Sequence, residues 1–374
     1  MNQRGFSLIE LLVACLLLMA VTAAVAGMAV PARHAFERTL ASADLTGGTR
    51  AALERLASDV REAGSGGSVG IDLVSVSDVM ASIVPLAGFD SPPAAPGQAI
   101  RITRIPPRAP QGVLRQAAPA GETTLVLEGS SNCSAGGDAC ALQPAMTALI
   151  FDAARGEPLV VAAVAPGGIV HLASPLRSSF DSGAVVASAV TTTYGLRPES
   201  DGSQRLVRTS TGGVEQPVLQ HVVGFEVHAM ATTAPTPGQL DDPHPTYGPI
   251  PPLTGIDDPR DSWGPGENCM FMRDGDGRLV ARLPSTTLGS METLDTSSLN
   301  DGPWCSDALD ATRFDADLLR IRLVELRLRV EAASAVWRGP VARLFRRPGT
   351  ERNAARWVPD VELRLTVRLR NARQ

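Results

Sequence analysis

Twenty consecutive residues without a charged side chain constrain this sequence more than any other feature. They run from Leu11 to Val30, and Thr22 is the one clearly polar side chain among them. As an α-helix with a rise of about 1.5 Å per residue, the run measures roughly 30 Å, which matches the hydrocarbon core of a bilayer. The flank before it carries one basic residue, Arg4, which favours keeping that end in the cytoplasm. The sequence therefore predicts a membrane helix followed by an exported body.

A cleavable secretory signal is the main alternative. Ala24, Val25 and Ala26 offer a small-x-small cleavage site. The apolar core of a signal peptide, however, spans roughly 7 to 15 residues, and this run is longer. Glu10 is a second objection, because a carboxylate at the edge of an apolar helix costs about 2–3 kcal/mol on insertion scales and is usually functional. We therefore expect a retained membrane helix.

The residues around Glu10 form a recognisable motif. The run Arg4-Gly5-Phe6-Ser7-Leu8-Ile9-Glu10-Leu11-Leu12 resembles the type III signal of type IV prepilins and type II secretion pseudopilins. The resemblance implies that a membrane prepilin peptidase cuts between Gly5 and Phe6 and methylates the new amino group of Phe6. It also implies that this amine pairs with Glu10 of a neighbouring subunit as helices stack, which offsets the desolvation of both charges.

The motif and the distribution of apolar residues divide the chain into four parts. A leader at residues 1–5 and a transmembrane helix at 6–30 precede an amphipathic continuation at 31–64 and a β-rich head at 65–374. Gly64 to Gly67 supplies the helix stop. The pilin resemblance implies that the continuation packs on the head, and an ordinary helix plus linker is the alternative. Its apolar residues recur at helical spacing: Phe36, Leu40 and Ala43, then Leu53, Leu56, Val60 and Ala63.

Beyond Ser68 the sequence consists of short β-branched runs bounded by Gly, Pro and Ser, which are typical of strands. Their closeness in sequence favours hairpins over βαβ units. The predicted fold class is therefore α+β, a long N-terminal helix packed on a mostly antiparallel β head. Alternation from Val361 to Arg370 predicts a sheet with one dry face. The predicted strands are 99–105, 123–128, 147–152, 159–164, 168–173, 184–194, 204–210, 218–230, 320–330 and 361–370.

A second, looser resemblance lies inside the head. The order of its motifs resembles the PilW group of minor pilins, to which pseudopilin J of type II secretion is a relative of similar design. A loop-rich insertion at about 234–303 departs from that group and reads as an elaboration of the head. The motifs are Tyr194, Leu206-Val207-Arg208, Gly212-Gly213, Gln216-Pro217-Val218 and Val222-Val223-Gly224-Phe225-Glu226-Val227.

Charge is unevenly distributed along the head. Residues 241–301 hold 11 acidic residues and 4 Arg, whereas residues 307–374 hold 15 Arg and 9 acidic residues. The two regions could pair within one head or between subunits, but exposed pairs are worth little, which favours two solvated faces. All 34 basic residues are Arg and 4% of residues are aromatic. This weakens any case for base stacking, and no nucleic-acid partner is expected.

Four of the five cysteines lie outside the membrane run, in which Cys15 is the exception. Oxidising chemistry on the exported side suggests disulfides. Proximity in sequence favours Cys133 with Cys140 and Cys269 with Cys305 among the three possible connectivities. A zinc site is the rival hypothesis, but the spacings lack the close pairs of zinc knuckles.

One loop combines a turn signal with two carboxylates. Asp274 and Asp276 alternate with glycines between two apolar runs, which predicts a hairpin. Their spacing also suits a hard cation, and some pseudopilins bind calcium in a head loop. The further acidic positions and terminal Glu of an EF-hand loop are absent, so the turn is favoured and calcium is the alternative.

Signatures of catalysis are missing from the sequence. There is no G-x-S-x-G elbow, no H-E-x-x-H and no Walker loop, so an enzyme is not expected. The expected function is a minor pilin of type IV pilus assembly, located in the bacterial inner membrane with an exported head and then in the pilus. Its expected partners are prepilin peptidase, other pilins or pseudopilins and the inner-membrane assembly platform. A J-like type II secretion pseudopilin and a membrane-tethered adhesin or binding module are the alternatives.

Overall fold

The computed structural model describes residues 8–66, 82–86, 97–106, 109–129, 142–152, 156–176, 178–200, 202–210, 213–232, 271–281, 291–293, 321–340, 343–350 and 357–370. The chain divides into two compact units. The first comprises Met1–Arg50 and Arg329–Glu362, and the second comprises Ala51–Leu328 and Leu363–Gln374. The predicted fold class is confirmed, because one long helix packs on a mostly antiparallel β domain.

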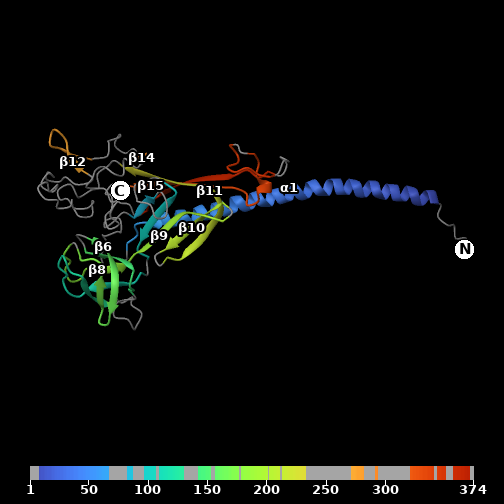
Figure 1. Cartoon of the computed structure of the whole chain (residues 1–374). Helices are drawn as coiled ribbons and strands as arrows, with labels where there is room; N and C mark the ends of the chain where they lie inside the picture. Colours follow the sequence, from blue (N-terminus) through green and yellow to red (C-terminus); the bar gives the residue numbers. More distant parts are fainter. Residues whose placement is uncertain are drawn as a thin grey trace. The chain divides into compact units, whose positions relative to one another are not determined.

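Helix α1 (Leu8–Glu62) is 55 residues long and continues through Pro31 (Figure 1). It stops where the glycines begin, as the sequence predicts. Gly64 has a φ of 73°, a left-handed conformation that glycine adopts without steric cost. Its backbone N–H donates to the carbonyl of Thr103 at 3.0 Å, which ties the end of the helix to the sheet of the second unit. The predicted leader, residues 1–5, lies outside the described residues.

Among the described residues, eight strands form the main sheet, and the strand pairs with a defined register are antiparallel. The predicted alternation in the last strand is confirmed: Val367 and Leu369 are buried, while Arg364 and Arg368 are exposed. The order is β1 (Ile83–Leu86), β2 (Ala99–Arg104), β9 (Val190–Pro198), β10 (Gln204–Ser210), β11 (Glu215–Thr232), β15 (Ile321–Val330) and β16 (Val361–Arg368), with β14 (Met291–Thr293) also paired to β11.

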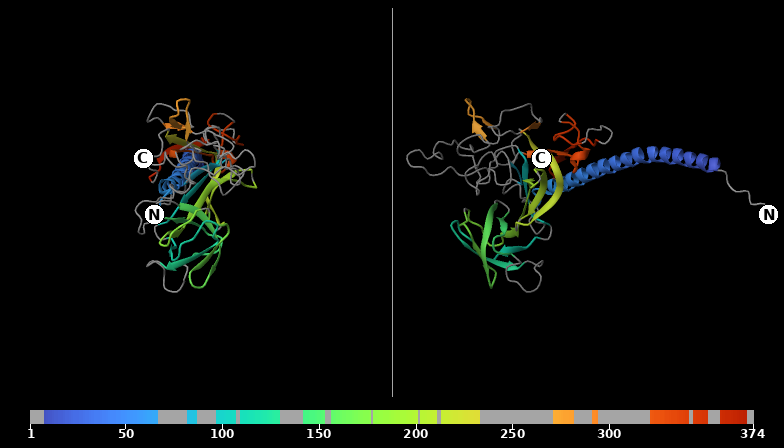
Figure 2. Two further views of the ribbon diagram at one scale, coloured as in Figure 1. Left: turned by 90° about the vertical axis from the view of Figure 1, so that its left-hand side faces the viewer. Right: turned by 45° about the vertical axis from the view of Figure 1, so that its right-hand side comes forward.

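A closed six-stranded barrel is inserted between two neighbouring strands of this sheet. Strands β2 and β9 pair directly, Ile100 opposite Tyr194, yet the whole barrel lies between them in sequence. The barrel order is β3 (Gln111–Leu114), β4 (Thr124–Gly129), β7 (Ile169–Leu172), β6 (Gly156–Ala165), β5 (Thr147–Phe151) and β8 (Val185–Ser188) (Figure 2). The prediction of a single strand at 184–194 is wrong, because β8 closes the barrel and β9 returns to the sheet after Ala189.

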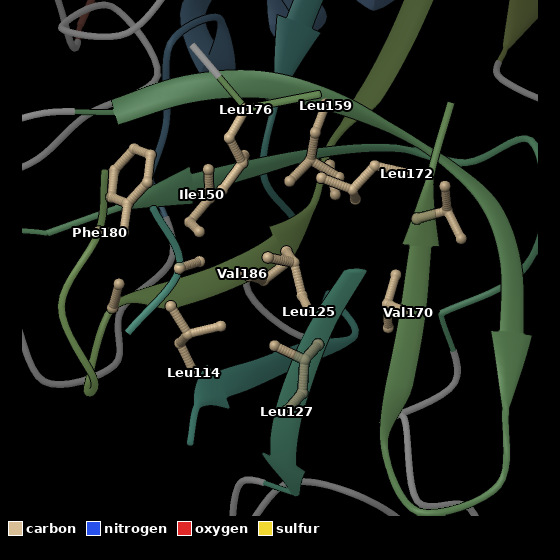
Figure 3. Close-up of a cluster of buried hydrophobic side chains, with 14 of the residues drawn as sticks. Leu114, Leu125, Leu127, Ile150, Leu159, Val170, Leu172, Leu176, Phe180 and Val186 are labelled. Carbon is tan, nitrogen blue, oxygen red and sulfur yellow. The ribbon is translucent and has the colours of Figure 1, made fainter. Parts of the chain in front are cut away.

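The barrel is filled by its own side chains. Branched residues from all six strands point inward and meet at its centre, where Leu125, Ile150, Val170 and Val186 are fully buried (Figure 3). Phe180, from the segment before β8, is also buried in this cluster. In a small barrel, the residues along each strand alternate between inward and outward positions, and the inward-facing apolar side chains fill the interior so that no channel is left. The barrel is therefore a core of its own within the head.

A short hairpin, β12 (Phe271–Arg273) and β13 (Leu279–Ala281), confirms the turn predicted at Asp274-Gly275. The Asp274 carboxylate accepts hydrogen bonds from the backbone N–H groups of Asp276 and Arg278, at 3.0 and 2.8 Å. Most of the predicted insertion at 234–303 lies outside the described residues. So do Cys133, Cys140, Cys269 and Cys305, and the disulfide hypothesis stays a prediction.

Candidate assembly site

The N-terminal half of α1 presents apolar side chains that no described part of the chain covers. The helix is long and apolar enough to cross a membrane, and no residue in its most apolar stretch is buried. The hydroxyl of Thr22 is satisfied inside the helix by the carbonyls of Leu18 and Met19, at 2.9 and 3.0 Å. Internal satisfaction of its polar groups is what a segment in hydrocarbon requires.

Glu10 lies in the first turn of α1 and is exposed. A carboxylate at this end interacts favourably with the positive end of the helix dipole. Every neighbour from Leu8 to Leu12 is apolar and exposed, so this one charge stands at the start of an otherwise apolar surface. Gly5 and Phe6, the predicted cleavage and methylation residues, lie outside the described residues.

The apolar surface of the helix extends beyond the predicted membrane span. Phe36 is 65% exposed and Leu40 is 54% exposed. The expectation that the stripe beginning at Phe36 packs on the head is therefore wrong for these two residues. Burial of apolar side chains begins further along, and the predicted second stripe is confirmed, with exposed fractions of 0–3% at Leu53, Leu56, Val60 and Ala63.

A half-buried carboxylate beside that second stripe fixes the helix to the sheet. Asp59 accepts a hydrogen bond from the Tyr194 hydroxyl at 2.7 Å and another from Nε of Arg208 at 3.1 Å. Arg104, from β2, lies 3.8 Å from its second oxygen and also pairs with Glu62. The helix end is thereby tied to three adjacent strands, β2, β9 and β10.

Strand register brings the partners of Asp59 together. Tyr194 and Arg208 are opposite each other in the β9–β10 pair, and the guanidinium carbon of Arg208 lies 6.0 Å from the ring centroid. The remaining donors of Arg208 bind Ser210 and Thr192. Burial and the negative charge of Asp59 raise the pKa of Tyr194, so its hydroxyl stays protonated and donates.

Sequence reasoning singled out Tyr194 and Arg208 through the PilW-like order but missed Asp59. A signal for it was present. Asp59 falls between Leu56 and Val60 on the apolar stripe, where a carboxylate is costly to bury unless it is paired. Its side chain is 13% exposed and that of Arg208 is 14% exposed, so the pair is largely shielded from water.

The C-terminal end of α1 is bonded to the sheet, whereas the side chains of its N-terminal half are exposed. Residues 1–26 match the prokaryotic N-terminal methylation motif. This motif is consistent with a type IV prepilin-like signal, and together with a helix long and apolar enough to cross a membrane it supports a pilin-like protein. The match ends inside α1, before the sheet begins. No curated protein matches the chain.

The remaining candidate residues are placed as follows. Asp274 and Asp276 lie together in the β12–β13 turn, where the Asp274 carboxylate already binds backbone N–H groups. Within the described ranges, no three His, Cys, Asp or Glu side chains come together as metal ligands. Part of the Arg-rich C-terminal region pairs inside the head, since Arg327 contacts both Glu325 and Glu226.

Proposed function

We propose that this pilin-like chain is a minor pilin, a non-catalytic structural subunit of type IV pilus assembly. Prepilin peptidase would cut after Gly5 and methylate Phe6. The subunit would then reside in the bacterial inner membrane with its head exported, and join other pilins through α1 at the assembly platform. One observation carries the proposal: the apolar half of α1 is uncovered while its C-terminal end is fixed to the sheet by Asp59.

The apolar surface of such a helix must be shielded from water both before and after assembly. Lipid covers its apolar surface before assembly, and neighbouring helices replace lipid in the fibre. Phe36 and Leu40 extend this surface past the predicted span, so they suit contacts with neighbouring subunits better than contacts with the chain's own head. The PilW-like assignment draws support from the contact that Tyr194 and Arg208 share with Asp59.

Two further functions remain as candidates. A J-like type II secretion pseudopilin would use the same helix chemistry in a different machine. A membrane-tethered binding module is favoured by the barrel, because strands β2 and β9 already pair directly and the sheet does not need six more strands between them. An added domain of this kind suits contact with a target outside the fibre.

Complementation of a deletion strain tests these functions together. The minor pilin proposal predicts loss of surface pili, retained type II secretion and full rescue by the whole chain. A second rescue uses a chain in which residues 105–189 are replaced with Asn-Gly. Arg104 and Val190 are paired in register, so a two-residue turn joins them. We expect this shorter chain to restore pili and to lose any target binding.

The result that contradicts the minor pilin proposal is a deletion strain with normal pili and defective type II secretion. Failure of the barrel-free chain to restore pili, at a normal cellular level of that chain, would assign the barrel to assembly instead of binding.

A further inference from the structure

In the described part of the arm between β15 and β16 (residues 331–360), both acidic side chains are buried, whereas Arg343 and Arg346 are exposed. The acidic side chains in its described part are Glu331 and Asp360, which are 0% and 2% exposed. Arg338 and Arg347 pair with Glu331 at 3.1 and 2.7 Å. The charges left on the surface of the described arm therefore come from arginine.

A short turn in the arm is held rigidly by Asp360. Its carboxylate accepts a hydrogen bond from the backbone N–H of Arg346 at 2.8 Å, and its own N–H donates to the carbonyl of Leu344 at 3.0 Å. Arg329 pairs with the same carboxylate at 2.9 Å and donates to the carbonyl of Arg343 at 3.1 Å. Asp360 thus fixes the backbone of this turn from inside.

One side chain of this turn faces the interior and three face the solvent. Phe345 is buried and meets the Trp357 ring edge to face, with centroids 5.8 Å apart. Leu344 is 59% exposed, and Arg343 and Arg346 beside it are exposed. A rigid turn that presents one large apolar side chain between two arginines has the composition of an interfacial anchor.

The arm belongs to the same compact unit as the membrane helix. Figures 1 and 2 both draw its orange-red ribbon beside α1. On α1, half-buried positions begin at His34, about 6 Å past Val30 along the helix axis, and recur at Glu37 and Ala41. Arg33, on the same short stretch, adds a further exposed basic side chain.

We propose that the turn Arg343–Arg346 docks on the anionic lipid surface of the leaflet from which α1 emerges. Leu344 enters the headgroup region, and Arg343 and Arg346 pair with lipid phosphates. This contact exists while the subunit resides in the membrane and is given up when the helix leaves the bilayer for a fibre. An acidic protein partner is the alternative occupant, and the experiment below distinguishes it.

Photocrosslinking in nanodiscs tests the contact on the full-length chain. Leu344 is replaced with a photoreactive benzophenone amino acid, and the protein is embedded in either phosphatidylcholine or a mixture of phosphatidylcholine and phosphatidylglycerol. Val214, 69% exposed and in the other unit, carries the same probe as the matched control. We expect lipid adducts at position 344 in the anionic nanodiscs and none at position 214.

Charge removal provides the second readout. Each arginine near an anionic surface strengthens attraction about fivefold, so R343A/R346A should lower the adduct yield by about 25-fold. R364A/R368A, which removes two exposed arginines of β16, should leave the yield unchanged. An adduct yield independent of lipid charge, adducts only with a second protein, or equal yields at positions 344 and 214 would overturn the proposal.

Discussion

Replacing Glu10 with alanine should leave processing and membrane insertion intact and reduce co-purification with other pilin subunits by about tenfold or more. The variant makes the start of α1 more apolar, so anchoring is not weakened. Assembly suffers because the methylated amine of the neighbouring subunit would be buried without its counter-charge, which is strongly unfavourable. Co-purification of affinity-tagged subunits from membranes, together with counts of surface pili, measures the effect.

A matched control separates this role from a general effect of charge on the helix. Glu37 is another carboxylate of α1, paired with Arg33 at the surface, where such pairs contribute little. Glu37→Ala should therefore assemble like the native chain. If Glu10→Ala assembles at the native level, Glu10 has no role in assembly. If the variant is no longer processed, Glu10 acts in recognition by the peptidase.

The second large effect is expected at the other end of the helix. Asp59→Ala removes the shared acceptor of Tyr194 and Arg208 and leaves the half-buried Arg208 guanidinium without its counter-charge. Breaking a fully buried pair in this way costs about 3–5 kcal/mol, which is the upper bound for this half-buried pair. We expect the melting temperature of the detergent-solubilised chain to fall by about 5–15 °C. Proteolysis should become faster in the helix end that Asp59 holds against the sheet.

Two further variants decide whether the effect is specific to this carboxylate. Asp44→Ala changes an exposed acidic residue of the same helix and should alter the melting temperature by less than about 1–2 °C. Asp59→Asn keeps a hydrogen-bond acceptor for Tyr194 but loses the charge. Its melting temperature should lie between those of Asp59→Ala and Asp44→Ala. Equal stability of Asp59→Ala and the native chain would mean that the cluster does not fix the helix.

Local patterns predicted the elements of this fold well. The stripe Leu53, Leu56, Val60 and Ala63 identifies the buried face of α1, and Gly64 marks its end because the stop needs a left-handed residue. Alternation identifies β15 and β16 in the same way. Each of these signals is formed by residues a few positions apart, so it can be recognised without knowing which distant segments pair.

Long-range pairing was harder to predict. The barrel closes through β3 and β8, where Gln111 meets Ala187, and no local signal reports that pairing. Ala189 separates β8 from β9 without a Gly or Pro, so the two strands read as one. Asp59 and Tyr194 are likewise 135 positions apart. The sequence identified the apolar run and Glu10, whereas the anchor of the helix required the strand register.

Mass spectrometry of the mature N-terminus tests the central claim most directly. The chain is purified from membranes that contain prepilin peptidase, and its N-terminal peptide is sequenced. A pilin-like subunit processed at the matched motif begins with Phe6 and carries one methyl group on the amino nitrogen. A chain that begins at Met1, or at a small residue near position 27, would contradict the account.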